Sequence, residues 1–135
     1  MATFNKFNAL AADLPNGVHN LASDQLVVAL TNSAPIATNS VLADITEIAY
    51  TNLSSRNLTT TSSTQTGGTY SLVLVDLPLT ASGNVEAWRY VVIYNSTPAA
   101  NNLIAWYDRG GSVAMIDGDV ITLDLTEAQT LFDLS

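Results

Sequence analysis

The chain has 135 residues, of which 47% are hydrophobic and 12% are charged, and its formal net charge is −8. This length predicts one domain over residues 1–135 with a core that is stable by itself, and the lack of cysteine excludes disulfides and thiolate metal sites. Lysine and arginine total only four, too few for the clustered cations that bind a phosphate backbone, so we expect no direct nucleic-acid partner.

The first segment, residues 1–14, carries apolar side chains at helical spacing and is followed by Pro15. It is interpreted either as a short helix that closes one end of the core or as an N-terminal arm that packs on a neighbouring subunit or a capsid, because chain ends detach easily. It lacks the apolar run of a signal peptide, and no stretch approaches the ~20 apolar residues of a membrane span. The residues that such an interface would use are Phe4, Lys6, Phe7 and Leu10.

Alternation of apolar and polar residues predicts a first strand over residues 25–31. Leu26, Val28 and Leu30 are expected to face the core, and Val27 and Thr31 to face solvent.

The next segments mix a helical signal with extended ones. Asp44 and Glu47 are spaced like a capping box, which predicts one or two helical turns after Asp44 with Ile45, Ile48 and Ala49 buried. Residues 57–68 are almost all Thr, Ser, Gln and Gly, a composition typical of an exposed edge strand or loop. Residues 70–79 are apolar on both faces and predict a strand that Pro78 ends.

The strongest strand signal is at residues 86–108, where two runs rich in aromatic and β-branched residues flank turn residues and predict a hairpin. Apolar groups on both faces of the first run predict a central strand covered on both sides. One face is expected to carry Trp88, Tyr90, Val92 and Tyr94, and the other Ala87, Val91 and Ile93.

After the hairpin, residues 109–112 predict a turn, 112–116 a short strand, 117–119 another turn, and 120–125 and 130–134 the last strands. The pattern predicts an all-β fold: an antiparallel two-sheet sandwich, jelly-roll-like, with about eight short strands and one or two short helices.

Candidate catalytic groups are few. His19 is the only histidine, no Gly-x-Ser-x-Gly motif accompanies it, and we interpret it as a turn or strand-end residue held by hydrogen bonds. Glu86 and Asp108 are the one acid pair for glycoside hydrolysis, since a hairpin brings them to matching strand ends. Strand-end acids are usually solvated, however, and Arg89 or Arg109 can neutralise them.

A calcium site among Asp108, Asp117, Asp119, Asp124 and Asp133 stays open, although the Asp-x-Asp-x-Asp-Gly loop is absent and Gly118 favours a tight turn. We therefore predict that the protein is not an enzyme and binds no cofactor.

Several phrases of the sequence are informative together. They are Thr-Phe-Asn-Lys-Phe-Asn at 3–8, Gly-Val-His-Asn-Leu at 17–21, the run at 24–39, Asp-Ile-Thr-Glu-Ile at 44–48, Arg-Tyr-Val-Val-Ile-Tyr-Asn at 89–95 and Leu-Ile-Ala-Trp-Tyr-Asp at 103–108. With them the chain resembles small virion structural proteins of tailed bacteriophages, most of all head-decoration (cement) proteins. The resemblance implies a β-sandwich or jelly-roll domain that clamps neighbouring capsomers, and it carries over no catalytic residues.

The expected function is therefore capsid decoration. The expected partners are other copies of the chain, in a trimer or dimer, and the major capsid protein, and the expected location is the capsid surface of a virion after synthesis in the host cytoplasm. The alternative is a tail or fibre component that contacts the host surface, with Trp106 and Tyr107 as the sugar-binding candidates, or that contacts another tail protein. A depolymerase that uses Glu86 and Asp108 is the third reading.

Overall fold

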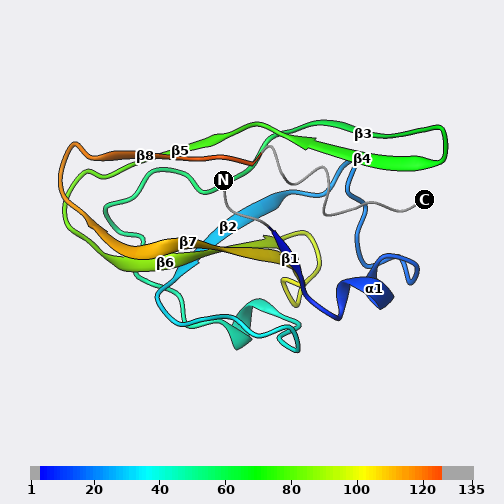
Figure 1. The fold of residues 1–135 in the computed structure, drawn as a ribbon, viewed down its shortest axis with the longest axis horizontal. Helices are drawn as coiled ribbons and strands as arrows, with labels where there is room; N and C mark the ends of the chain where they lie inside the picture. Colours follow the sequence, from blue (N-terminus) through cyan, green and yellow to red (C-terminus); the bar gives the residue numbers. More distant parts are fainter. Residues whose placement is uncertain (1–3, 126–135) are drawn as a thin grey trace.

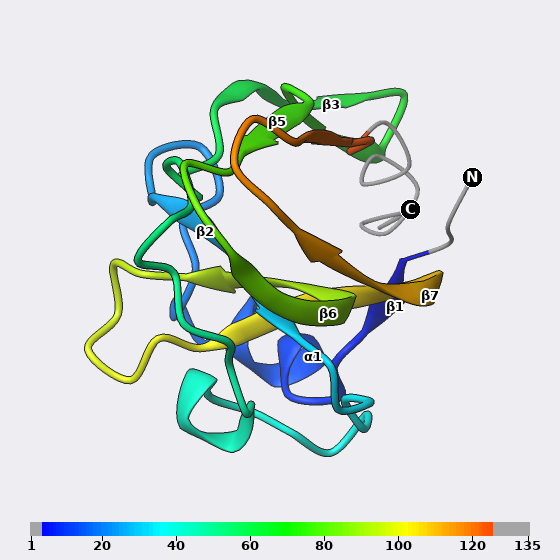
Figure 2. The same cartoon turned by 90° about the vertical axis from the view of Figure 1, so that its left-hand side faces the viewer.

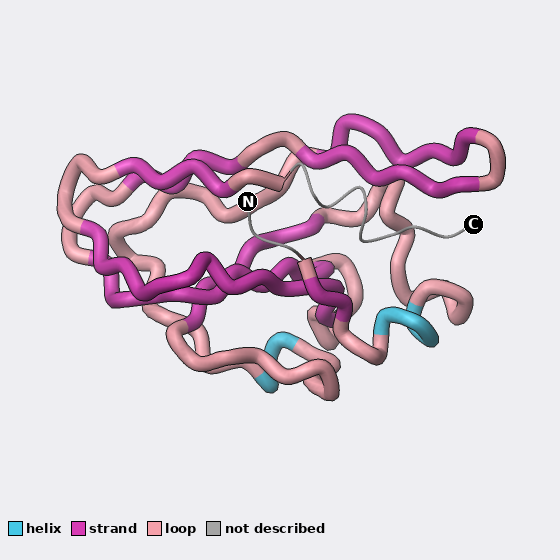
Figure 3. Tube along the Cα trace, in the orientation of Figure 1, coloured by secondary structure: helices cyan, strands magenta, loops and turns pink. Residues whose placement is uncertain are grey.

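The computed structural model describes residues 4–125, and within them eight strands form three antiparallel sheets (Figure 1 and Figure 3). The four-stranded sheet has the order β1-β7-β6-β2. Its strands are β1 (Asn5–Lys6), β2 (Leu26–Thr31), β6 (Val85–Asn95) and β7 (Leu103–Met115). The two-stranded sheets pair β3 (Thr60–Thr66) with β4 (Thr69–Leu74), and β5 (Leu77–Thr80) with β8 (Val120–Leu123).

Helices are short in this part of the chain: they are α1 (Leu10–Asp13) and the 3-10 helix η1 (Leu42–Asp44). None of the described helices is long and apolar enough to cross a membrane. The expected all-β antiparallel architecture is thus confirmed, and the strand expected at residues 130–134 lies outside the described residues.

The four-stranded sheet is covered on both faces. Figure 1 shows the two-stranded sheets above it and the segment 32–48, which contains η1, below it. The main core lies between the upper and middle layers and includes Trp88 and Leu30. A smaller cluster on the other face includes Val92 and Leu103, with Leu42 packed against it. The central, doubly covered position expected for the first hairpin strand is confirmed, because β6 lies between β7 and β2.

The segment 32–48 covers the face of β2 that was expected to be exposed to solvent. All six residues of β2 are buried, including Val27 and Thr31, which were expected to face solvent. Val27 packs in the smaller cluster beneath the sheet, together with Ile45 from the segment 32–48. Alternation along a strand shows which residues share a face, but it does not show whether a distant segment covers that face.

The expected turn at residues 109–112 is a bulge instead. β7 runs without a break from Leu103 to Met115, and its register against β6 shifts between the pairs Trp88↔Val113 and Tyr90↔Asp108. Gly110 has a φ of 94°, a backbone conformation that favours glycine. Bulges bend strands, and Figure 2 shows β6 and β7 rising from the four-stranded sheet toward β5 and β8.

The same irregularity corrects the face assigned to Trp88. Its side chain lies in the main core with Val91 and Ile93, while Val92 and Tyr94 lie in the cluster on the opposite face. The period-2 rule holds only for a regular strand, and the register shift between Trp88 and Tyr90 interrupts it.

Two other boundaries differ from expectation. The helix expected after Asp44 instead ends there: the Asp44 carboxylate accepts the backbone N–H groups of Ser40 (2.9 Å) and Val41 (3.3 Å), which lowers its pKa. Ile48 is buried as expected, but Ala49 is exposed. The strand expected over residues 70–79 is divided into β4 and β5.

The outer edge of β2 is closed by the segment 48–58. Val28 N–H donates to Arg56 O (2.9 Å), Ile48 N–H donates to Leu30 O (3.0 Å), and Leu30 N–H donates to the Tyr50 hydroxyl (2.9 Å). The Tyr50 hydroxyl in turn donates to Glu47 Oε1 (2.7 Å), because burial raises the pKa of this phenol and keeps it protonated. A side chain therefore completes the ladder where the backbone does not.

We expect Tyr50→Phe to lower the free energy of unfolding by about 1–3 kcal/mol, because it leaves the buried Leu30 N–H without its acceptor. Urea unfolding at neutral pH measures the change. Tyr90→Phe is the matched control, since its hydroxyl has no hydrogen bond to another residue within 4–125, and it should change stability by less than about 0.5 kcal/mol. Equal effects of the two substitutions would contradict the role given to Tyr50.

Candidate functional site

The most organised polar cluster of the described residues lies at the loop that joins β6 to β7. Its centre is Asn95, the last residue of β6, which is fully buried. The Asn95 side chain connects three segments: Nδ2 lies 2.7 Å from Asp24 Oδ2 and 2.9 Å from His19 Nδ1, and Oδ1 accepts the backbone N–H of Thr97 (3.0 Å). We call His19, Asp24 and Asn95 the loop cluster.

These partners determine the protonation of His19. Asn95 Oδ1 is occupied by a backbone donor, so Asn95 Nδ2 faces both Asp24 and His19. An amide nitrogen has two protons and no acceptor capacity; it therefore donates one proton to Asp24 and the other to His19 Nδ1. His19 is consequently neutral, with its own proton on Nε2.

Burial also favours the neutral form of His19. It lowers the pKa of the imidazole, and this outweighs the opposite influence of the Asp13 and Asp24 carboxylates. His19 Nε2 has no hydrogen-bond partner among the described residues, and it lies 3.9 Å from Asp13 Oδ2, which accepts Asn102 Nδ2 at 3.3 Å. The interpretation of His19 as a residue held by hydrogen bonds is confirmed at Nδ1.

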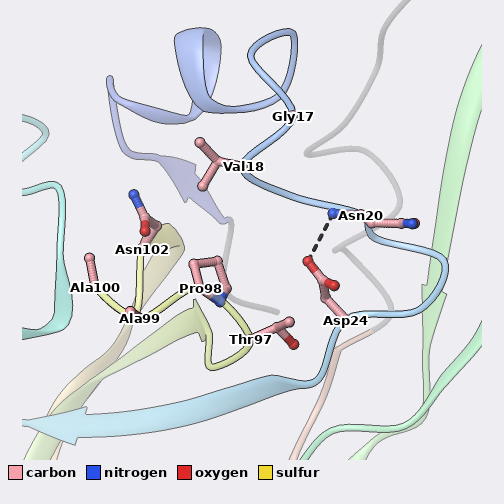
Figure 4. Close-up of a pocket in the computed structure, with 9 residues that line it drawn as sticks. All are labelled: Gly17, Val18, Asn20, Asp24, Thr97, Pro98, Ala99, Ala100 and Asn102. Atoms are coloured by element: carbon pink, nitrogen blue, oxygen red, sulfur yellow. Dashed lines mark hydrogen bonds between the residues drawn. The ribbon is translucent and has the colours of Figure 1, made fainter.

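A surface depression of about 520 Å³ lies beside the loop cluster (Figure 4). Asp24 and Thr97 bring polar oxygens to it, and both are engaged: Asp24 Oδ2 accepts Asn20 N–H (2.9 Å), and Thr97 Oγ1 accepts Gln25 N–H (3.1 Å). The depression is open, and small residues form much of its lining. The arrangement ties the β6–β7 loop to the segment that precedes β2. The residues that line it are Gly17, Val18, Asn20, Asp24, Thr97, Pro98, Ala99, Ala100 and Asn102.

The expected glycosidase pair is not assembled. Asp108 pairs with Tyr90 across the sheet, four positions along β6 from Glu86, a separation of about 13 Å along the strand. Carboxylates that cleave glycosides lie about 5–9.5 Å apart. Arg89 binds both oxygens of Asp108 (2.8 and 2.9 Å) and lowers its pKa, and Glu86 Oε2 accepts Ala49 N–H (2.9 Å).

The N-terminal interface candidates are divided by burial. Phe4, Phe7 and Leu10 are buried in the domain itself, while Lys6 is exposed. The helix expected over this segment is confined to α1, and the residues before it are extended: Asn5 and Lys6 pair with β7. This pairing places the Phe4 ring against Tyr107, with 5.0 Å between ring centroids, and the Phe7 ring against Trp106, with 4.5 Å. An interface that keeps the domain intact can use only Lys6 of the four.

The sugar-binding candidates do not share a surface. Tyr107 lies in the main core, where burial raises its pKa to about 12, and Trp106 packs against the cluster on the other face of the sheet. Trp88 is fully buried. The aromatic side chains of the hairpin thus serve packing on two faces rather than one continuous binding platform.

Asp117 and Asp119 form the turn that Gly118 predicts. Asp119 Oδ2 accepts Ile116 N–H (3.0 Å), and Gly118 adopts a φ of 89°. Among residues 4–125 no three His, Cys, Asp or Glu side chains are grouped to hold a metal ion. Asp133, the remaining calcium candidate, lies outside the described residues.

The loop cluster itself was not predicted. An asparagine that ends an apolar strand and an isolated histidine are the only sequence signals for it, and they are 76 positions apart.

Comparisons of the chain with protein-family models, with curated proteins and with solved structures found no match.

Proposed function

We propose that the protein is a structural component of a tailed-bacteriophage virion, and specifically a capsid decoration protein that binds the head surface and stabilises contacts between capsomers. The resemblance of its sequence phrases to such proteins motivates the proposal, and the finer fold that accompanies it is a jelly-roll-like two-sheet sandwich. The protein acts as a homo-oligomer on the major capsid protein and has no enzymatic role in this proposal.

The observation that carries the proposal is the combination of a doubly covered sheet with a surface of low charge density. Only 12% of the residues are charged, and polarity comes instead from hydroxyl and amide side chains. Uncharged polar groups cost less to bury in an interface than ions do. Acids that would be candidates for catalysis, Glu86 and Asp108, are occupied by a backbone amide and an arginine.

Localisation on virus particles tests the proposal directly. An antibody against the protein, visualised with gold on negatively stained particles that contain it, is expected to label the heads. Label on tails or fibres would support the alternative role in the tail and overturn the decoration role. Protein that does not remain with purified particles would overturn both.

Lys6→Glu tests the one exposed member of the N-terminal candidates. We expect its affinity for isolated heads to fall by up to about fivefold at low salt, the range of a single exposed charge pair, with unchanged stability. Co-sedimentation with heads that lack the protein measures the effect, and Arg109→Glu, on the exposed bulge of β7, controls for net charge. Equal binding by both variants would remove Lys6 from the interface.

A further inference from the structure

In the part of the chain that the structure describes, the outer edge of β3 is an unprotected strand edge. Its inner edge pairs with β4, and no described residue pairs with the other edge. Gly67 and Gly68, with φ of 59° and 86°, form the two-residue turn that closes this hairpin between Thr66 and Thr69. Hydrogen-bonded and non-hydrogen-bonded pairs alternate back from such a turn, so Ser63 and Gln65 direct their backbone N–H and C=O groups outward.

Three of the other strand edges in the described part of the chain carry protection. The segment 48–58 covers β2, β1 is two residues long and contains Lys6, and β5 contains Pro78. Short length, lysine, proline and a covering segment are the usual devices that prevent strand-to-strand association. β3 has seven residues without a charge or a proline, and its one irregularity, at Thr61, leaves residues 62–66 regular.

Charge favours a second copy of the chain as the occupant. The protein has a net charge of −8, so most approaches of two copies bring like charges together. Residues 57–75 contain no charged side chain, and β3 and β4 lie within this range. The hairpin is therefore a surface on which two copies can meet without ionic repulsion or desolvation of ions.

We propose that two copies of the protein pair edge to edge through β3, antiparallel and across a two-fold axis, with Thr64 opposite the partner's Thr64. In this register Ser63 lies opposite the partner's Gln65, and the outward backbone groups of the two strands satisfy each other. The same surface serves both copies, as two-fold symmetry requires. The opposed side chains carry hydroxyl or amide groups, which pair favourably across strands.

The pairing deepens the self-association that the proposed function includes and in that sense rests on it. The experiment measures the pairing without any capsid, so the β3 pairing and the capsid role can be overturned independently. Thr64→Lys is the disrupting variant: Thr64 is exposed, and the substitution places two lysines directly opposite each other, which destabilises a strand pair. Thr64→Gln is the neutral control at the same site, and Thr80→Lys, exposed on β5, adds the same charge elsewhere.

Sedimentation velocity over a concentration series is expected to show reversible dimers for the unmodified protein, Thr64→Gln and Thr80→Lys, and a shift to monomer for Thr64→Lys. Thermal unfolding monitored by circular dichroism verifies that all variants are folded. Hydrogen exchange should show slower exchange of the Ser63 and Gln65 amides in the dimer than in the monomer. An unmodified protein that stays monomeric, dimers that persist in Thr64→Lys, or exchange at these amides that does not respond to concentration would each overturn the proposal.

Discussion

Asn95→Ala is expected to lower the free energy of unfolding by about 3–5 kcal/mol, because three polar groups lose their partner at once. Asn95 is fully buried, and its amide serves Thr97 N–H, His19 Nδ1 and Asp24 Oδ2. Hydrogen bonds to a carboxylate are the stronger kind, about 1.5–3 kcal/mol each, and unpaired buried groups incur their desolvation penalty. Urea unfolding near neutral pH measures the change.

Asn84→Ala is the matched control for this measurement. Asn84 lies in the turn before β6, its side chain is exposed, and only its backbone carbonyl accepts a described side chain, Asn52. The control should change stability by less than about 0.5 kcal/mol. A loss of less than about 1 kcal/mol in Asn95→Ala would mean that the loop cluster contributes little to the fold.

Acidification should destabilise the protein through His19. Its pKa is lowered in the folded state from the ordinary value of 6.5, chiefly by burial, so the unfolded chain binds more protons just below that pH. The free energy of unfolding therefore falls as the pH decreases below about 6.5, and it continues to fall until the pKa of the folded state is reached. The melting temperature is expected to decrease between about pH 7.5 and about pH 5.5.

His19→Gln identifies the group responsible, since glutamine has no titrating group. Its melting temperature should be nearly constant over the same pH range. Asp44 and Asp108 also have lowered pKa values, but their ordinary value is 3.8, so they stay ionised in this window and lose their contribution only in stronger acid. An equal decrease in the variant and the unmodified protein would show that His19 is not the group. NMR of the imidazole nitrogens should independently show the neutral form with the proton on Nε2.

The parts of the fold that local patterns predicted are those with local causes. Paired aromatic and β-branched runs predicted the β6–β7 hairpin, and Asp117, Gly118 and Asp119 predicted the turn before β8. The bulge at residues 109–112 was predicted as a turn, because two adjacent glycines are compatible with either a turn or a bulge. What distinguishes them is whether the chain reverses, and this depends on pairing with β6 on both sides of the glycines.

The candidate site was predictable only in its components. His19 was recognised as a residue held by hydrogen bonds, but its main partner, Asn95, belongs to a strand 76 positions away. Glu86 and Asp108 were expected to lie at matching strand ends, but the hairpin register places Asp108 opposite Tyr90, four positions along β6 from Glu86. The composition of either strand does not show the register in which the two strands pair.

By itself the sequence determined the β-rich class, the central hairpin and the low charge of the surface, since backbone preference and side-chain polarity belong to single residues and their neighbours. The tertiary structure decided which strand faces are covered, where the N-terminal phenylalanines pack and which amide holds His19. These outcomes depend on contacts between segments far apart in the chain. Such contacts stabilise the fold only once the sheets are stacked and bury apolar surface.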